Sequence, residues 1–212
     1  MFKRAVLLTW GLAFILAEIT GIGVSYLAYV QGVSGILSGC IADMVIIIVR
    51  TLTLICIAKS YDVSLAYAVY KPLPMGRGLI ILPMVVFYVI ILDYLVTIVF
   101  YGSYSPQLLG INYFIEQKLL WAFPFKVGYY FSEVIVMNYM YILAKRAWPL
   151  LRPPITAGTI FLVLGWAIPH ILTKNVIVAL YAIVLVVIFY VSYEYSKSPL
   201  APITLWFTIL IV

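Results

Sequence analysis

Charged side chains are scarce in this sequence of 212 residues: only 9% are Asp, Glu, Lys or Arg, whereas 66% are hydrophobic. A soluble domain needs polar side chains to cover its surface, so this composition excludes an ordinary soluble protein and predicts an integral membrane protein. Backbone polar groups in lipid must be satisfied within the spanning structure, which leaves helices or a closed barrel. The apolar runs are long and continuous, a pattern that favours helices.

Histidine and cysteine are also rare, with one and two residues respectively. A single histidine excludes bis-histidine ligation of a haem within the chain. Cys40 and Cys56 fall in one predicted helix, about 24 Å apart, which is too far for a disulfide. We expect both to be small, buried, apolar residues. The sequence contains no HExxH, GxSxG or CxxC motif and no glycine-rich loop that would cradle a phosphate.

Long apolar runs predict an all-α, polytopic transmembrane bundle with six spans and a shorter seventh. We expect residues 1–212 to form a single transmembrane domain in contact with the lipid bilayer. The first run contains Glu18 and lacks a clear cleavage site, so we expect it to be retained as a span. The expected spans are 5–30, 35–58, 78–100, 127–150, 155–174, 176–195 and 201–212.

The last of these spans has 12 residues, about 18 Å as a helix, and falls short of the roughly 30 Å hydrocarbon core. We expect this helix either to stop inside the membrane or to be supported by its neighbours. Before the fourth span, the amphipathic, aromatic segment INYFIEQKLLWAF is expected to form an interfacial helix.

Lysine and arginine are distributed unequally between the two sets of predicted loops. Because cytoplasmic loops are enriched in these residues, the bias predicts a cytoplasmic N-terminus. The net charge of +6 includes no basic cluster with interleaved aromatics, so nucleic acid is not an expected partner. The richer set carries Lys3, Arg4, Lys59, Lys71, Arg77, Lys145, Arg146, Arg152 and Lys197, and the poorer set carries Lys118, Lys126 and Lys174.

Ionisable residues inside predicted spans are costly, by about 3 kcal/mol on insertion scales, and usually face the interior of the bundle. A polar site at one depth would suit a divalent metal, since imidazole and carboxylate are ligands for zinc, iron or manganese. A hydrogen-bonded network that fixes helix packing is the other interpretation, and both stay open. The residues predicted at a common depth, about 6–12 Å below the outer surface, are Asp43, Asp93, Glu133 and His170.

Arg50 is predicted to lie deeper than Asp43 on the same helix. The two residues are seven apart and share a helix face, but side chains that pair within a helix are three or four residues apart. We therefore expect Arg50 to meet a group on another helix, with Glu18 as the candidate. A role in orienting the helices is favoured over a catalytic role.

Three segments in the C-terminal part of the chain carry sparse polar residues: YYFSEVIVMN (129–138), GWAIPH (165–170) and SPLAPITLWFTIL (198–210). In order and spacing they resemble the EExxxR, FxxxH and HxxxN helices of the CPBP family, the CAAX-protease and bacteriocin-processing intramembrane proteins. The resemblance covers the chain from about residue 125 to its end. It implies a helical core in which glutamates and histidines activate a water molecule, directly or through a divalent metal.

Most of the aligned positions differ from the family pattern. Only Glu133 and His170 match, as a glutamate of the first motif and the histidine of the second. Position 206 is also predicted to enter from the cytoplasmic side, whereas Glu133 and His170 lie toward the outside. The differing residues are Ser132 for the other glutamate, Met137 for the arginine, Trp166 for the phenylalanine, Trp206 for the histidine and Leu210 for the asparagine.

Motif spacing without motif chemistry favours a catalytically degenerate CPBP-like protein that binds a membrane partner or peptide through the same cavity. An alternative is an active hydrolase that uses Glu133, His170 and a carboxylate of span two or three, with or without a metal. A third hypothesis is a small accessory subunit of a larger membrane complex, which the short last span favours. A transporter is weaker, since no paired broken helices occur in repeated halves.

Overall fold

Helices are the only regular elements in the part of the chain that the computed structural model describes, which confirms the all-α prediction. Described are residues 1–69, 118–149, 155–173, 176–211 and, between 83 and 99, positions 83, 85–88, 90–92, 94–95 and 98–99. The elements are α1 (Phe2–Leu8), η1 (Thr9–Leu16), α2 (Ala17–Val30), α3 (Gly35–Tyr61), α4 (Ala66–Val69), α7 (Phe123–Ala147), α8 (Ala157–Leu162), η2 (Val163–Ala167), α9 (His170–Thr173), α10 (Val176–Ser196) and α11 (Leu200–Ile211).

Three of the helices are long and apolar enough to cross a membrane: Phe2–Val30, Gly35–Tyr61 and Val176–Ser196. They correspond to the expected spans 5–30, 35–58 and 176–195. Ala157–Leu172 is apolar but shorter. Twelve positions of the expected span 78–100 are described, and all twelve are helical. Most of the predicted interfacial helix lies outside the described residues, and its described part at 118–122 is mainly turn.

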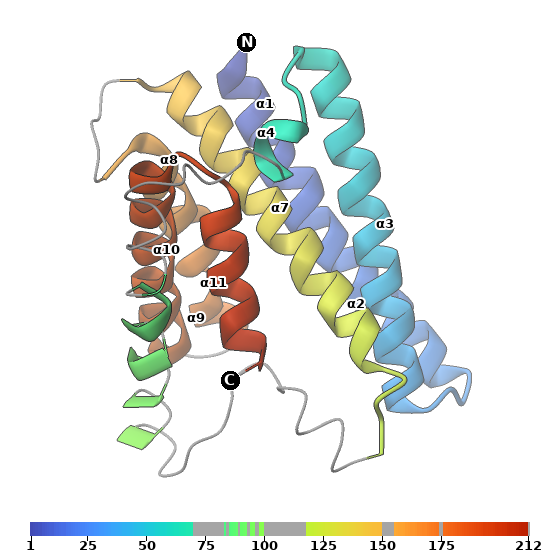
Figure 1. Ribbon diagram of the computed structural model, residues 1–212. Helices are drawn as coiled ribbons and strands as arrows, with labels where there is room; N and C mark the ends of the chain where they lie inside the picture. The colour runs from blue at the N-terminus through green and yellow to red at the C-terminus, as the bar shows by residue number, and fades with distance from the viewer. Residues whose placement is uncertain are drawn as a thin grey trace.

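Helix α7 occupies the centre of the bundle and contacts α1, α3, α4, α8 and α11 (Figure 1). Its middle and C-terminal parts, from Ser132 to Ala144, are almost entirely buried. A helix enclosed by protein on all sides does not need the apolar surface that lipid demands, because other helices satisfy its polar groups. This position explains why α7 carries Glu133 and Asn138 yet forms the core.

Asn138 connects α7 to three other segments. Its amide nitrogen Nδ2 donates to the carbonyl oxygens of Ala68 at 3.0 Å and Pro199 at 3.3 Å, and its Oδ1 accepts from the hydroxyl of Tyr190 at 3.1 Å. Asn138 is fully buried, so each of these bonds satisfies a group that water cannot reach. The amide thus holds α4, α10 and the start of α11 against α7.

The contact between Asn138 and Pro199 explains the short last helix. Asn138 precedes the end of α7 by nine residues, so α11 starts about 13 Å inside that end of the bundle. Trp206 then reaches Tyr130, with ring centroids 6.0 Å apart. The prediction that position 206 lies far from the depth of Glu133 is therefore wrong, because α11 begins deep in the bundle and is supported by α7 and α10.

Both cysteines lie in α3 and are free thiols, as the sequence predicts. Cys40 is buried, but Cys56 is exposed on the helix surface. The expectation that both are buried is therefore wrong for Cys56. That residue lies on a face of α3 that the described helices do not cover, and an apolar side chain there is compatible with lipid.

Close packing of α8 against α7 generates a first prediction, at Gly158. A Cβ atom on Gly158 would lie 2.5 Å from Cδ2 and 2.7 Å from the backbone oxygen of Tyr141. Gly158→Ala should therefore lower the free energy of unfolding by about 1–3 kcal/mol, the cost of overpacking. The control is Gly39→Ala in α3, where a Cβ would meet nothing within 4 Å. Thermal unfolding in detergent measures both variants, and equal midpoints would contradict the prediction.

Candidate functional site

Two π-helical segments, η1 and η2, border a buried polar cluster. The indole nitrogen Nε1 of Trp10 in η1 donates to the backbone oxygen of Gly165 in η2 at 2.8 Å. In η1, the backbone oxygen of Ala13 accepts from Nε of Arg50 at 3.3 Å. Short π segments are frequent at functional sites because their widened turns re-aim backbone groups. Here carbonyl groups of both π segments accept hydrogen bonds from side chains of other helices.

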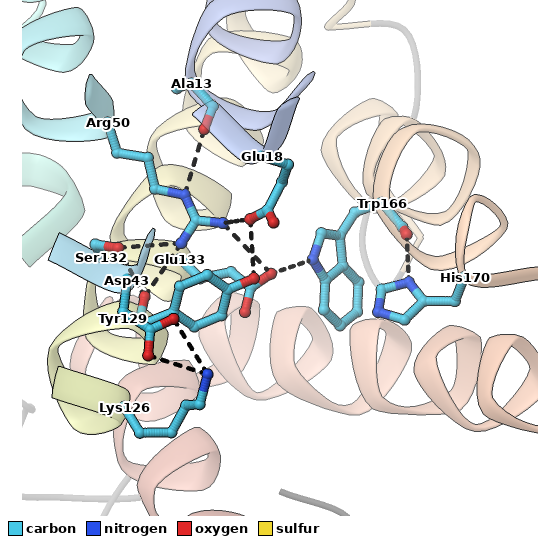
Figure 2. A network of polar contacts seen from close by, with 10 residues as sticks. All are labelled: Ala13, Glu18, Asp43, Arg50, Lys126, Tyr129, Ser132, Glu133, Trp166 and His170. Atoms are coloured by element: carbon cyan, nitrogen blue, oxygen red, sulfur yellow. Dashed lines mark hydrogen bonds and ion pairs between the residues drawn. The ribbon is translucent and has the colours of Figure 1, made fainter. Parts of the chain in front are cut away.

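Arg50 of α3 lies at the centre of this cluster and is fully buried (Figure 2). Its Nη2 lies 2.6 Å from Oε1 of Glu18 and 3.8 Å from Oε1 of Glu133. Its Nη1 donates to the backbone oxygen of Tyr129 at 3.1 Å and to the hydroxyl of Ser132 at 3.0 Å. The ion pair with Glu18 is the one that the sequence predicts. From α3, this planar guanidinium contacts η1, α2 and α7 at once, which an ammonium group cannot match.

Glu133 is buried between Arg50 and Trp166. Its Oε1 accepts a hydrogen bond from Nε1 of Trp166 at 3.0 Å. Nδ1 of His170 lies 2.8 Å from the backbone oxygen of Trp166, and the two rings meet edge to face at 4.7 Å. A carbonyl oxygen only accepts, so Nδ1 of His170 is the protonated ring nitrogen in this contact.

No hydrogen bond or ion pair joins Glu133 directly to His170, although the sequence predicts both at a common depth. Trp166, one turn before His170, lies between the two side chains and hydrogen-bonds to both (Figure 2). Counting residues along a helix gives depth but not the direction in which a side chain points around the axis. The ring of Trp166 fills the space in which the two groups would have met.

Asp43 forms a separate ion pair. Its Oδ1 and Oδ2 lie 3.1 Å and 3.0 Å from Nζ of Lys126 in the first turn of α7. Asp43 and Arg50 thus both face α7 from the same side of α3, at different heights. Asp93, the other predicted member of the polar network, lies outside the described residues.

The carboxylates of this cluster face cations. Asp43 pairs with Lys126, and Glu18 and Glu133 share Arg50. Within the described ranges, no group of three or more His, Cys, Asp or Glu side chains is placed to hold a metal ion. A catalytic zinc site uses about three protein ligands. The residues of this cluster therefore do not fit the divalent metal that the sequence raised as an option.

The three motif-like segments do converge. The rings of Trp166 and Trp206 lie 5.7 Å apart and nearly perpendicular, and Phe189 and Tyr130 contact the other sides of Trp206. Met137, at the position of the family arginine, is fully buried. In the described part of the chain, Nε1 of Trp206 is the one buried side-chain nitrogen or oxygen without a hydrogen-bond partner. Aromatic rings thus occupy the volume between the motif positions.

A second polar cluster surrounds Glu194, near the end of α10, and sequence reasoning missed it. Glu194 pairs with Lys145 and with Lys197, the latter at 2.8 Å, and accepts from the hydroxyl of Tyr141 at 2.6 Å. Thr156 donates to that same hydroxyl at 3.0 Å. The signal was present: Glu194 is an acidic residue at the end of an apolar helix, and lysines lie nearby in sequence and at the end of α7.

Comparison with known protein families, with curated proteins and with solved structures finds no significant match. The resemblance to the CPBP family therefore rests on the aligned positions of the three C-terminal segments.

The buried cation generates a second prediction. Arg50→Met leaves two carboxylates without their guanidinium, and breaking a buried pair from one side costs about 3–5 kcal/mol. The midpoint of thermal unfolding should fall strongly, and adding Glu18→Gln and Glu133→Gln to Arg50→Met should restore most of the loss. Lys59→Met, which removes an exposed cation from the same helix, is the control and should change the stability by no more than about 0.5 kcal/mol. A triple variant no more stable than Arg50→Met would contradict the charge argument.

Proposed function

We propose that this chain is a polytopic membrane protein of six or seven spans that binds a partner within the membrane and does not hydrolyse peptides. We place its N-terminus in the cytoplasm. The start of α1 and the ends of α3, α7 and α10 lie at one end of the bundle (Figure 1). These termini carry Lys3, Lys59, Lys145 and Lys197 among the basic residues, and an excess of Lys and Arg is typical of the cytoplasmic side.

One observation supports the binding proposal: the motif positions lie together, but none of their side chains is free to act as a general base. A general base must reach a water molecule that is close to the substrate. Glu133 instead accepts from Trp166 beside Arg50, and Trp206 stands where the family has a histidine. This arrangement supports a degenerate CPBP-like protein. Aromatic side chains pack where the family has reactive groups, and the remaining glutamate faces an arginine.

Glu18 supports a partner within the membrane. It lies near the middle of the long helix Phe2–Val30, and 37% of its side chain is exposed. A partly exposed carboxylate at that depth is costly in lipid, so a hydrogen-bond donor from another helix would stabilise it. Ile22 and Tyr26, one and two turns further, are exposed, and a Cβ on Gly23 would meet nothing within 4 Å. Small residues allow close approach of a second helix. We therefore propose α2 as the contact surface for a transmembrane helix.

A second candidate function, an accessory subunit of a larger membrane complex, is favoured by the same exposed face of α2. The two functions differ in how long the complex lasts. A subunit stays bound to its complex through purification at a fixed stoichiometry, whereas a regulatory partner binds and dissociates. The hydrolase alternative requires Glu133 or His170 to leave its contact with Trp166 before either can act on a water molecule.

Photo-crosslinking in native membranes tests the contact surface. A benzophenone amino acid at Ile22 should give one discrete adduct with another membrane protein, and Glu18→Gln should reduce its yield because the charge-assisted contact is lost. The matched control is the same amino acid at Leu180, which is 58% exposed on α10. Equal adducts from both positions, or none from Ile22, would contradict the assignment of α2.

Peptide hydrolysis tests the other half of the proposal. The substrates are a prenylated CAAX peptide and a transmembrane peptide, each offered to the purified chain in liposomes. The wild type should cleave them no faster than the variants Glu133→Gln and His170→Ala do, because neither side chain is free to activate water. Release of new peptide termini is measured by mass spectrometry. Cleavage that either substitution abolishes would overturn the proposal in favour of an intramembrane hydrolase.

A further inference from the structure

A pocket of about 410 Å³ opens at the end of the bundle that holds the N-terminus, away from the Arg50 cluster. This volume is within the range of about 300–1,000 Å³ that is typical of ligand pockets. Its walls come from α4, the last turns of α7 and the end of α10. The lining residues are Tyr67, Ile142, Lys145, Arg146, Pro149 and Tyr193.

Arg146 is the residue of this pocket best placed to bind a ligand. Its guanidinium lies over the rings of Tyr67 and Phe2, at 5.5 Å and 5.8 Å from their centroids. Contacts with aromatic rings attract the cation without using its N–H groups as donors to oxygen. None of the ion pairs within the described residues involves Arg146, and its side chain is exposed.

The local charge is positive. Lys145 and Lys197 both pair with Glu194, so a single carboxylate faces two ammonium groups, and Arg146 adds a third cation. Lys3 lies over the ring of Trp148, next to the pocket, at 5.8 Å. An anionic group in the pocket would meet this excess of positive charge. Arginine favours phosphate because its parallel N–H groups bind two phosphate oxygens at once.

The remaining walls are apolar or aromatic: Ile142, Pro149 and the rings of Tyr67 and Tyr193. A free phosphate ion would leave these surfaces in water, whereas a lipid brings both a phosphate and hydrocarbon to the same place. The pocket lies at the end of the bundle, level with the headgroup region that a membrane around α3 and α10 would form. Basic pockets between helices at the cytoplasmic side commonly bind anionic headgroups.

We propose that this pocket, with Arg146 as its main anion-binding residue and Lys145 as the second, binds the phosphate group of an anionic phospholipid. The proposal does not depend on the partner-binding function, because it uses other residues at another level of the bundle. Bound lipid would tie α4 and the ends of α7 and α10 together at the membrane surface.

Native mass spectrometry of the purified chain tests the assignment. The protein is placed in phosphatidylcholine with a minor fraction of phosphatidylglycerol, and retained lipids are counted after mild delipidation. Wild type should retain phosphatidylglycerol in preference to phosphatidylcholine, and Arg146→Gln should weaken this binding about fivefold, the equivalent of roughly 1 kcal/mol for one cation. Arg146→Lys, which keeps the charge but loses the paired donors, should give an intermediate value.

Lys59→Gln is the matched control, because it removes an exposed cation from the same end of the bundle without lining the pocket. An equal loss in Arg146→Gln and Lys59→Gln would indicate general attraction to an anionic surface and overturn the site. Displacement of the lipid by inorganic phosphate at matched concentration would overturn the lipid assignment in favour of a free phosphate. Thermal unfolding of each variant shows whether it is folded. If Arg146→Gln is not folded, the comparison of wild type with Arg146→Lys tests the site.

Discussion

A guanidinium that is fully buried in an apolar bundle is the constraint on which the rest of this structure depends. Removing Arg50 from water is costly unless nearby groups replace its hydration. The replacements come from two helices. The continuous helix Phe2–Val30 supplies a backbone oxygen of η1 and a carboxylate of α2, and α7 supplies a backbone oxygen and a hydroxyl. Each of these groups would lose its hydrogen bond or ion pair with Arg50 if its helix were shifted or rotated. The cation therefore sets the mutual register of the N-terminal helices and the central helix more tightly than apolar side chains would.

The aromatic cluster on the other side of Glu133 acts differently. Trp166 donates one hydrogen bond to the carboxylate and otherwise packs against Trp206 and His170. Edge-to-face rings of this kind contribute about 0.5–1.5 kcal/mol each beyond the area they bury. On one side, Glu133 faces the charge of Arg50, an interaction that depends on direction. On the other side, it faces a cluster of aromatic rings that is mostly apolar. A carboxylate held in this way is well suited to fixing structure and poorly exposed to a reacting molecule.

The sequence predicts those features that depend on composition and on single helices. The helical class and three helices that are long and apolar enough to cross a membrane follow from the length of the apolar runs. The pairing of Arg50 with Glu18 follows from the need of a buried cation for an anion. The features that depend on rotation about a helix axis do not follow. Lys126, predicted in a loop, lies in the first turn of α7 and pairs with Asp43. Trp166 separates Glu133 from His170. The depth of Trp206 does not follow from its own segment, because nothing there shows that α11 begins beside Asn138.

The hydrogen bond between Trp10 and Gly165 joins residues that are 155 positions apart. The chain is synthesised from its N-terminus to its C-terminus, so Trp10 is in place long before its acceptor Gly165 exists. The contacts of η1 and α2 with α3 can form as soon as α3 has been made, because those elements are neighbours in sequence. The seam between the two π segments, in contrast, can close only after the chain as far as Gly165 has been synthesised.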